Sequence, residues 1–149
     1  MPDPVTGPVG ALHHVELWVP DLDRAVAQWG PLLGALGYAV HQDWPAGRSW
    51  RLGPTYVVVE RSPDLDGAVH ERRRPGLNHL AFHAGAPAEV DALVEAAVAV
   101  GWRLLFADRH PWAGGPEHYA AYLEDAAGFE VELVASGPSP GRTPGPAGA

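Results

Sequence analysis

The sequence contains no cysteine and no lysine, and both absences narrow what the chain can do. Without cysteine there are no structural disulfides, no cysteine-based zinc sites and no cysteine nucleophile. Ten arginines against 18 acidic residues give a formal net charge of −8, without a basic stripe, so we expect no binding to nucleic acid or to a membrane surface. No apolar run reaches the roughly 18 residues of a membrane helix, and no secretory signal pattern is seen, which predicts a cytoplasmic protein.

Proline and glycine are concentrated at the two ends of the 149-residue chain. Residues 1–10 and 136–149 have almost nothing to bury, which predicts flexible tails. Between them, 46% hydrophobic content is typical of a globular protein. We expect a first module over 11–62, a linker loop over 63–76 and a second module over 77–135.

A weak internal repeat supports this division. Leu12–Leu17 reads LHHVEL and Leu77–Phe82 reads LNHLAF, and a helical stretch follows each. Each half then closes with an apolar strand that carries glutamate, at Tyr56–Glu60 and at Phe129–Val134. Matching landmarks in matching order indicate a duplicated unit. The fold class predicted is α+β, with two tandem βαβββ modules that form a curled mixed sheet with a concave metal site.

Local signals give the elements. Asp21 is suited to cap a helix that ends near Gly37, and Gly30-Pro31 is expected to bend or interrupt it. Pro87 suits the first turn of a second helix, and Gly101 suits its end. We expect strands near residues 12–19, 38–42, 49–52, 56–60, 103–107, 118–124 and 129–135.

Two histidines and two glutamates are the residues that could together form a metal site. If Val15, Leu17 and Val19 face the helix that follows them, His14 lies on the opposite face of its strand, and His79 occupies the matching position in the second module. Glu60 and Glu132 end or interrupt apolar strands, where an unpaired carboxylate is unfavourable. Two imidazoles and two carboxylates suit a divalent cation. A slip of two residues in register would put Glu130 in the place of Glu132.

Three stretches of the sequence resemble the vicinal oxygen chelate superfamily. Residues 13–25 (HHVELWVPDLDRA) are similar to its opening strand and helix, 76–82 (GLNHLAF) to the start of its second module, and 119–133 (YAAYLEDAAGFEVEL) to its closing hairpin. The superfamily includes glyoxalase I, bleomycin-resistance proteins, fosfomycin-resistance enzymes, methylmalonyl-CoA epimerase and extradiol dioxygenases. One departure is the turn Asp125-Ala126-Ala127-Gly128, which replaces a more polar glyoxalase turn.

The resemblance implies metal ligands at His14, His79 and Glu132, and a fourth at Glu60 as in glyoxalase I and the epimerase. It implies one divalent ion (Ni, Zn, Co, Mn, Mg or Fe) that a small-molecule substrate chelates through two neighbouring oxygens. The ion would stabilise an enediolate as a Lewis acid. Glu132 or Glu60 would then move the proton as the catalytic base. Family members commonly pair, so a homodimer is expected, with the site completed within one chain or across two.

The substrate-binding residues expected are Trp50, Arg48, His118, Tyr122 and Glu16. His118 and Tyr122 share one face of a strand, and Trp50 with Arg48 would hold a flat or anionic group. The best interpretation is a glyoxalase-I-like lyase or isomerase. The alternatives are a non-catalytic small-molecule (antibiotic) binding or resistance protein, and an Fe(II) extradiol-type dioxygenase.

Overall fold

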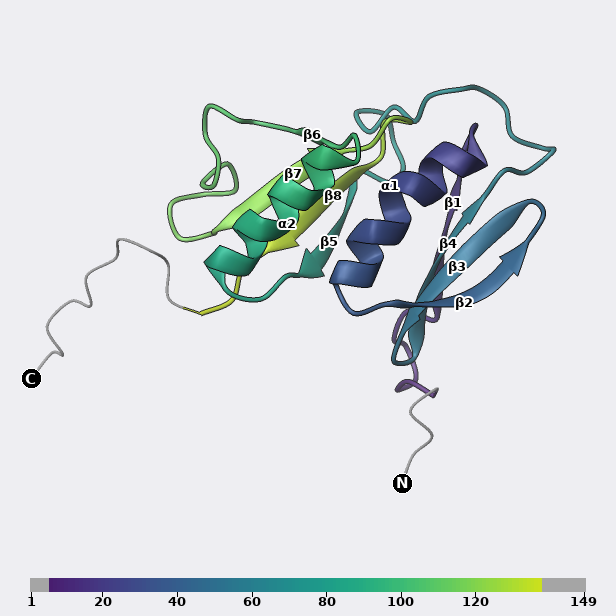
Figure 1. Cartoon of the computed structure of the whole chain (residues 1–149), viewed down its shortest axis with the longest axis horizontal. Helices are drawn as coiled ribbons and strands as arrows, with labels where there is room; N and C mark the ends of the chain where they lie inside the picture. Colours follow the sequence, from purple (N-terminus) through teal and green to yellow (C-terminus); the bar gives the residue numbers. More distant parts are fainter. Residues whose placement is uncertain (1–5, 138–149) are drawn as a thin grey trace, which may run out of the picture.

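The structure is a computed structural model that describes residues 6–137, and it consists of two four-stranded sheets and two helices (Figure 1). Residues 1–5 and 138–149, which hold most of the two expected tails, lie outside the described residues. The elements are β1 (His14–Trp18), α1 (Leu22–Ala35), β2 (Ala39–Trp44), β3 (Gly47–Leu52), β4 (Thr55–Glu60), β5 (His79–His83), α2 (Pro87–Ala99), β6 (Arg103–Leu104), β7 (Ala120–Glu124) and β8 (Glu130–Val134). Within the described range, no helix has the length and apolar character that a membrane span requires.

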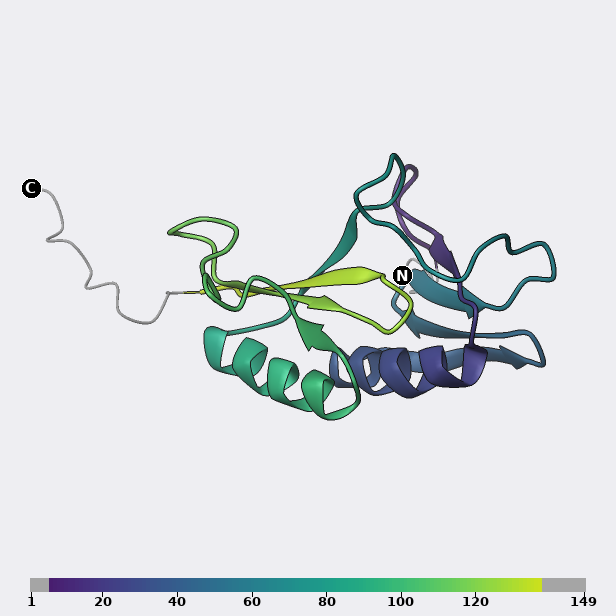
Figure 2. The same cartoon turned by 90° about the horizontal axis from the view of Figure 1, so that it is seen from above.

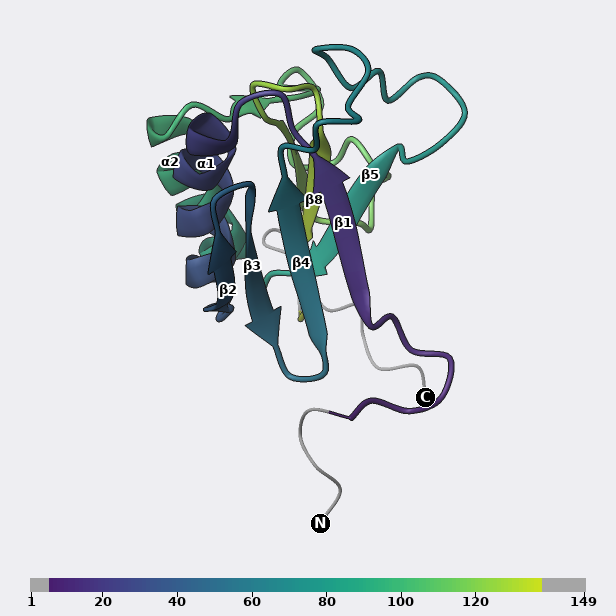
Figure 3. The same cartoon turned by 90° about the vertical axis from the view of Figure 1, so that its right-hand side faces the viewer.

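The two sheets repeat one topology. Sheet A has the strand order β1-β4-β3-β2 and sheet B the order β5-β8-β7-β6. In each, the first and last strands of the module pair in parallel and the other neighbours are antiparallel. The α+β class and the doubled βαβββ unit are confirmed, but the curled sheet consists of two separate, unclosed halves. Figure 3 shows β1 at one edge of sheet A and β2 at the other, and β5 holds the edge of sheet B that corresponds to β1.

Helix α1 begins as the sequence predicts but continues through its proline. The Asp21 side chain caps the helix by accepting a hydrogen bond from the backbone N–H of Arg24 at 3.0 Å. Pro31 lies inside the unbroken helix, so of the expected bend or interruption the interruption does not occur, and the bend stays a prediction. The buried Trp29 and Leu32 fix the turns on both sides of the exposed proline to the core, so packing overrides the local preference.

Both helices cover the same side of the molecule (Figure 2), and α1 joins the two modules. The Trp29 indole N–H donates to the Asp125 carboxylate at 2.8 Å, and the Trp102 indole donates to the Gln28 carbonyl at 3.0 Å. The rings of Trp29 and Trp102 meet edge to face at 5.1 Å, fully inside one shared apolar core. Consequently the face of each sheet that points away from the helices is the one left for a functional site.

Two boundaries in the second module differ from the expected ones. Strand β6 stops at Leu104 rather than 107, because Phe106 has a φ of 52° in the left-handed region, which is incompatible with a continuing strand. Strand β7 begins at Ala120 rather than 118. The backbone between them, residues 105–119, forms the long β6–β7 loop.

A candidate metal and substrate site on sheet B

The buried carboxylate of Glu132 organises the helix-free face of sheet B. Its Oε2 lies 3.0 Å from Nε2 of His79, and its Oε1 lies 2.5 Å from Nε2 of His118. The hydroxyl of Tyr122 donates to Oε1 at 3.0 Å. Two imidazoles and a phenol from three different strands or loops therefore converge on one carboxylate, which is only 6% exposed. We call these four residues the Glu132 cluster.

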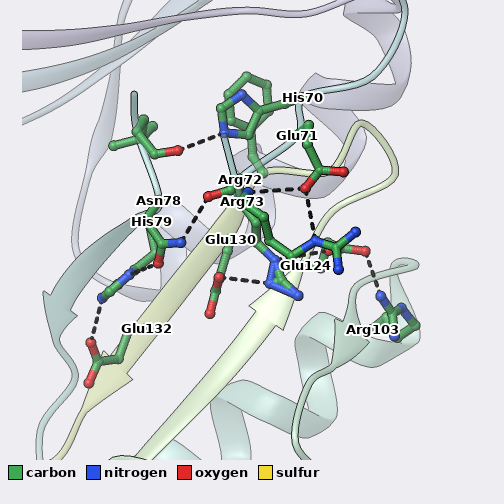
Figure 4. Close-up of polar contacts among 12 residues, drawn as sticks. His70, Glu71, Arg72, Arg73, Asn78, His79, Arg103, Glu124, Glu130 and Glu132 are labelled. Atoms are coloured by element: carbon green, nitrogen blue, oxygen red, sulfur yellow. Dashed lines mark hydrogen bonds and ion pairs between the residues drawn. The ribbon is translucent and has the colours of Figure 1, made fainter. Parts of the chain in front are cut away.

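The orientation of His79 is set by its neighbour in the chain. Its Nδ1 lies 2.7 Å from Oδ1 of Asn78, while its Nε2 points at Glu132, as Figure 4 shows. Asn78 is itself fixed, because its amide donates to the Arg72 carbonyl at 3.0 Å. Histidines that bind metals usually have the remote ring nitrogen held by an oxygen in this way. Asn78 is not among the site residues expected from the sequence, although its place directly before His79 was the available signal.

Electrostatics within the Glu132 cluster favour an ionised acid beside a neutral phenol. Burial alone would raise the pKa of Glu132, but the hydrogen bonds from His118 and Tyr122 and the charge of His118 outweigh it, so the pKa is lowered. Desolvation, followed by the hydrogen bond to Glu132, raises the pKa of Tyr122 to about 12. The cluster thus holds a carboxylate that is charged at neutral pH, with donors already aimed at it.

Glu130, the alternative to Glu132, has a different partner. It lies opposite His79 in the parallel register of β5 and β8, on the same face as Glu132. Its carboxylate pairs with the guanidinium of Arg72 at 3.0 Å (Figure 4), and Arg72 also reaches Glu124 at 3.5 Å. Desolvation raises the pKa of Glu130 in spite of the opposing charge of Arg72. Since Glu130 is ion-paired with Arg72, Glu132 is the acid that faces the histidines.

The first module has imidazoles but no acid in the corresponding place. His14 lies in register with Tyr56, and the two rings stack at 4.9 Å. His13 adds a ring nitrogen 2.9 Å from Nδ1 of His14, and His41 packs against the same tyrosine at 5.2 Å. By register, the counterpart of Glu132 in this module is Val58.

Glu60 does not meet His14. It lies at the far end of β4, in register with Trp18, four residues beyond the tyrosine that faces His14. Four residues of strand span about 13 Å, at roughly 3.3 Å per residue. The neighbour of Glu60 is instead Glu16, and desolvation together with the charge of Glu16 raises the pKa of Glu60.

His14, Glu60, His79 and Glu132 therefore do not surround one point within a single chain, and a site completed across two chains stays a prediction. Among residues 6–137 no group of three or more His, Asp or Glu side chains is arranged to hold a metal ion. What the structure does bring together is His79 with Glu132, joined by His118. This donor set of imidazole nitrogens and carboxylate oxygens fits a divalent cation in its chemistry, though it supplies fewer ligands than predicted.

The other expected substrate residues divide between the site and the scaffold. His118 and Tyr122 lie in the Glu132 cluster. Trp50 is 3% exposed and packs beneath α1, with its ring about 3.5 Å from where a side chain at Gly30 would begin. Arg48 pairs with Asp43 at 2.7 Å on sheet A. Neither Trp50 nor Arg48 lies in the Glu132 cluster, and their expected role in substrate binding stays a prediction.

Glu16 lies in a separate cleft. It accepts a hydrogen bond from the Trp18 indole at 3.3 Å, and both residues line a cavity of about 500 Å³ together with the 65–70 segment and Phe129. The lining includes neither Glu132 nor His79. If Glu16 contacts a substrate, it therefore does so in this cleft and not in the Glu132 cluster.

Comparison with known proteins agrees with the architecture. Residues 13–122 match the family model described as the glyoxalase/bleomycin resistance protein/dioxygenase superfamily. A Bacillus subtilis (strain 168) protein, the uncharacterized YqjT, is 46% identical over 126 residues, which cover 83% of this chain and 98% of that protein. The chain therefore belongs to the glyoxalase/bleomycin resistance protein/dioxygenase superfamily.

Solved structures extend this relationship. A crystal structure from Bacillus halodurans, which carries a provisional glyoxalase name, is 45% identical with a TM-score of 0.81, over 86% of this chain and 97% of that one. A mutant of the Listeria monocytogenes fosfomycin resistance protein FosX is 20% identical with a TM-score of 0.62, over 87% and 93% of the two chains. That mutant was crystallised with Mn(II) and 1S,2S-dihydroxypropylphosphonic acid. At this identity the likeness to FosX concerns the fold alone.

Proposed function

We propose that this chain is a metal-dependent enzyme that acts on a small substrate with two neighbouring oxygens. The observation that carries the proposal is the Glu132 cluster: a buried, ionised carboxylate that meets two imidazole nitrogens on the open face of a sheet. Such a carboxylate is costly to bury unless a cation or strong donors compensate it. The preferred reaction is a glyoxalase-like proton transfer, catalysed as a lyase or isomerase.

His79 and Glu132 would hold the cation, with Asn78 fixing the ring of His79. When bound, the ion would supply Lewis-acid polarisation of the substrate oxygens. His118 and Tyr122 would then orient the substrate, since both already donate toward the carboxylate. Glu132 is the candidate base. Glu60, whose raised pKa suits a base, lies beside Glu16 instead, so its catalytic role requires a substrate that reaches that end of sheet A.

We further propose that a second copy of the chain completes the ligand set with His14. His14 and His79 are the first residues of β1 and β5, which are equivalent edge strands of equivalent sheets. Neither edge is paired within the described chain. A homodimer that places β1 of one copy beside β5 of the other would bring an exposed His14 to the Glu132 cluster.

Mixing two defective variants tests this assembly. His14→Ala and His79→Ala should each lose tight Mn²⁺ binding in calorimetry. Unfolding and refolding the two variants together should restore about one tight site per four chains, the statistical yield of a shared site in random dimers. His14→Ala unfolded and refolded alone is the control. No restoration would mean that a single chain builds the site or that His14 is not a ligand.

The absence of an acid at Val58 favours a second candidate. Two histidines and one carboxylate are the ligands of non-haem Fe(II) oxygenases. A four-ligand glyoxalase site would need a second acid, and the strand register puts Val58 at the position that corresponds to Glu132. An Fe(II) extradiol-type dioxygenase would consume oxygen with a catechol as substrate. Metal analysis of the purified protein with an oxygen-uptake assay separates this function from a redox-inert one.

The non-catalytic binding protein is less well supported by the structure. That alternative needs an aromatic cleft, and three of the six tryptophans (Trp29, Trp50 and Trp102) are no more than 3% exposed. Those rings stabilise the core and the junction between modules. In a binder that holds no metal, Glu132 would serve only to orient His79, His118 and Tyr122.

A further inference from the structure

The β6–β7 loop, residues 105–119, lies on the side of sheet B that faces away from α2 (Figure 2). It supplies His118 to the Glu132 cluster. Gly114 is the point of contact: a side chain there would begin 2.6 Å from the Tyr122 hydroxyl and 2.6 Å from Cδ2 of His118. Only the bare glycine backbone fits against both residues. The loop therefore forms one wall of the site.

This wall is held in one shape by its own contacts. The Leu105 N–H donates to the Tyr122 carbonyl at 2.8 Å, and the Ala120 N–H donates to the Pro111 carbonyl at 3.1 Å. The ring of Trp112 meets Tyr119 edge to face at 5.3 Å. Because the start and the middle of the loop are hydrogen-bonded to β7 and Trp112 packs on the loop's last residue, its side chains are positioned in advance of any ligand.

Phe106 brings an aromatic ring from this loop to the site. Its φ of 52° lies in the left-handed region, which a bulky residue adopts only where the surroundings enforce it. The strained backbone directs the ring to the edge of Tyr122, at 5.6 Å between centroids, and leaves it 37% exposed. A strained, partly exposed aromatic residue beside a polar cluster is typical of a ligand contact rather than of core packing.

Arg109 places a cation over that ring. Its guanidinium carbon lies 5.1 Å from the centroid of Phe106, and its side chain forms no ion pair with any residue from 6 to 137. Arg48, Arg72 and Arg103, by contrast, each have a carboxylate partner. In a chain of net charge −8, an arginine at the edge of a site that has no acidic partner in the described part of the chain is available for an anionic ligand.

We propose that Arg109 and Phe106 determine substrate choice, by binding the carboxylate end of a small substrate whose other oxygens reach the Glu132 cluster. The apolar part of such a substrate would lie along Phe106 and Tyr122, and its carboxylate would meet the guanidinium. This inference rests on the proposed function for the location of the reacting oxygens. It gives the anion-binding role, expected for Arg48 and Trp50, to the β6–β7 loop.

Benzoate and benzamide provide a matched test, because they share one shape and differ in charge. Calorimetric titration of the full-length chain should show benzoate binding at least about tenfold more tightly than benzamide, since charge-assisted hydrogen bonds are roughly twice as strong as neutral ones. Arg109→Gln should remove this preference and leave the benzamide affinity unchanged. Arg24→Gln, which changes an exposed arginine on α1, is the matched control and should behave as the wild type.

Three results would overturn the proposal: equal affinity of the wild-type chain for both probes, no benzoate binding at millimolar concentration, or a benzoate affinity that Arg109→Gln leaves unchanged. Mn²⁺ titration of the same variants keeps this test apart from the proposed function. Arg109→Gln should bind Mn²⁺ as the wild type does, because Arg109 does not contact His79 or Glu132. Failure of every variant to bind Mn²⁺ would count against the proposed function and leave the benzoate result intact.

Discussion

The two modules share one topology but differ in what their open faces carry. Sheet B presents an acid, Glu132, to its histidine, whereas sheet A has Val58 at the matching position and surrounds His14 with other aromatic rings. Duplication therefore preserved the scaffold while the two polar faces diverged. One module supplies a carboxylate with its imidazoles, and the other supplies imidazoles alone, so neither face by itself has the predicted four-ligand set.

Removing the acid should have the largest effect on this asymmetry. Glu132→Gln keeps the size of the side chain but removes the charge that faces His79 and His118. We expect Mn²⁺ affinity to fall by at least about 100-fold, because losing even an outer partner of a metal ligand costs up to that factor. Calorimetric titration measures the change.

Glu130→Gln provides the matched comparison on the same strand. Because Arg72 already neutralises Glu130, this variant should keep Mn²⁺ affinity within a few-fold of the wild type. If instead Glu130→Gln abolished binding and Glu132→Gln did not, the assignment of the two acids would have to be exchanged.

The sequence predicts the scaffold well because the scaffold depends on local and repeated signals. Alternation in β1, the Asp21 cap, Pro87 at the start of α2 and the doubled LHHVEL and LNHLAF stretches all correspond to observed elements. The interruption expected at Pro31 fails for the opposite reason. Burial of Trp29 and Leu32 is a tertiary effect that no local preference reveals.

The site is predicted less completely, because it depends on register and on loop conformation. The pairing of His79 with Glu132 follows from placing each on the helix-free face of its strand. The separation of Glu60 from His14 follows from which residues of β1 and β4 are opposite one another, which the sequence does not specify. Phe106 and Arg109 reach the site through one left-handed residue in a long loop, and no periodic pattern marks such a turn.

The junction between the modules offers the next largest effect. The Asp125 carboxylate accepts hydrogen bonds from the Trp29 indole at 2.8 Å and from the backbone N–H groups of Phe129 and Ala127 at 2.8 and 2.9 Å. Asp125→Ala leaves these buried donors without a partner. We expect the free energy of unfolding to fall by about 2 kcal/mol, the penalty for unsatisfied buried groups, as measured by urea denaturation.

Asp125→Asn removes the titratable charge, although its single amide oxygen can keep only one of the two sets of hydrogen bonds that the carboxylate accepts. Burial raises the pKa of Asp125 in the folded chain above its ordinary value of 3.8. Its contribution to stability is therefore complete below that value and is lost as the pH rises through the folded-state pKa. Asp125→Asn should remove this loss, so the wild-type and variant unfolding curves should diverge with rising pH. Parallel pH profiles for the two proteins would show that burial of this charge does not affect stability.

The smallest effect is a spectroscopic one, confined to sheet B. Tyr122 and Tyr119 both have a pKa raised to about 12, but the causes differ: desolvation and then Glu132 for Tyr122, and the hydrogen bond to Asp91 for Tyr119. Glu132→Gln should lower the pKa of Tyr122 toward the ordinary 10.0, because the neutral amide no longer opposes a phenolate. Tyr119, whose hydroxyl donates to Asp91 at 2.6 Å, should be unaffected.

Ultraviolet titration of Glu132→Gln measures the pKa values of both tyrosines, and Tyr122→Phe assigns the signal of Tyr122. A Tyr122 pKa that stays near 12 would mean that burial alone keeps the phenol protonated, and that the acid of sheet B affects its neighbours less than the geometry of the cluster implies.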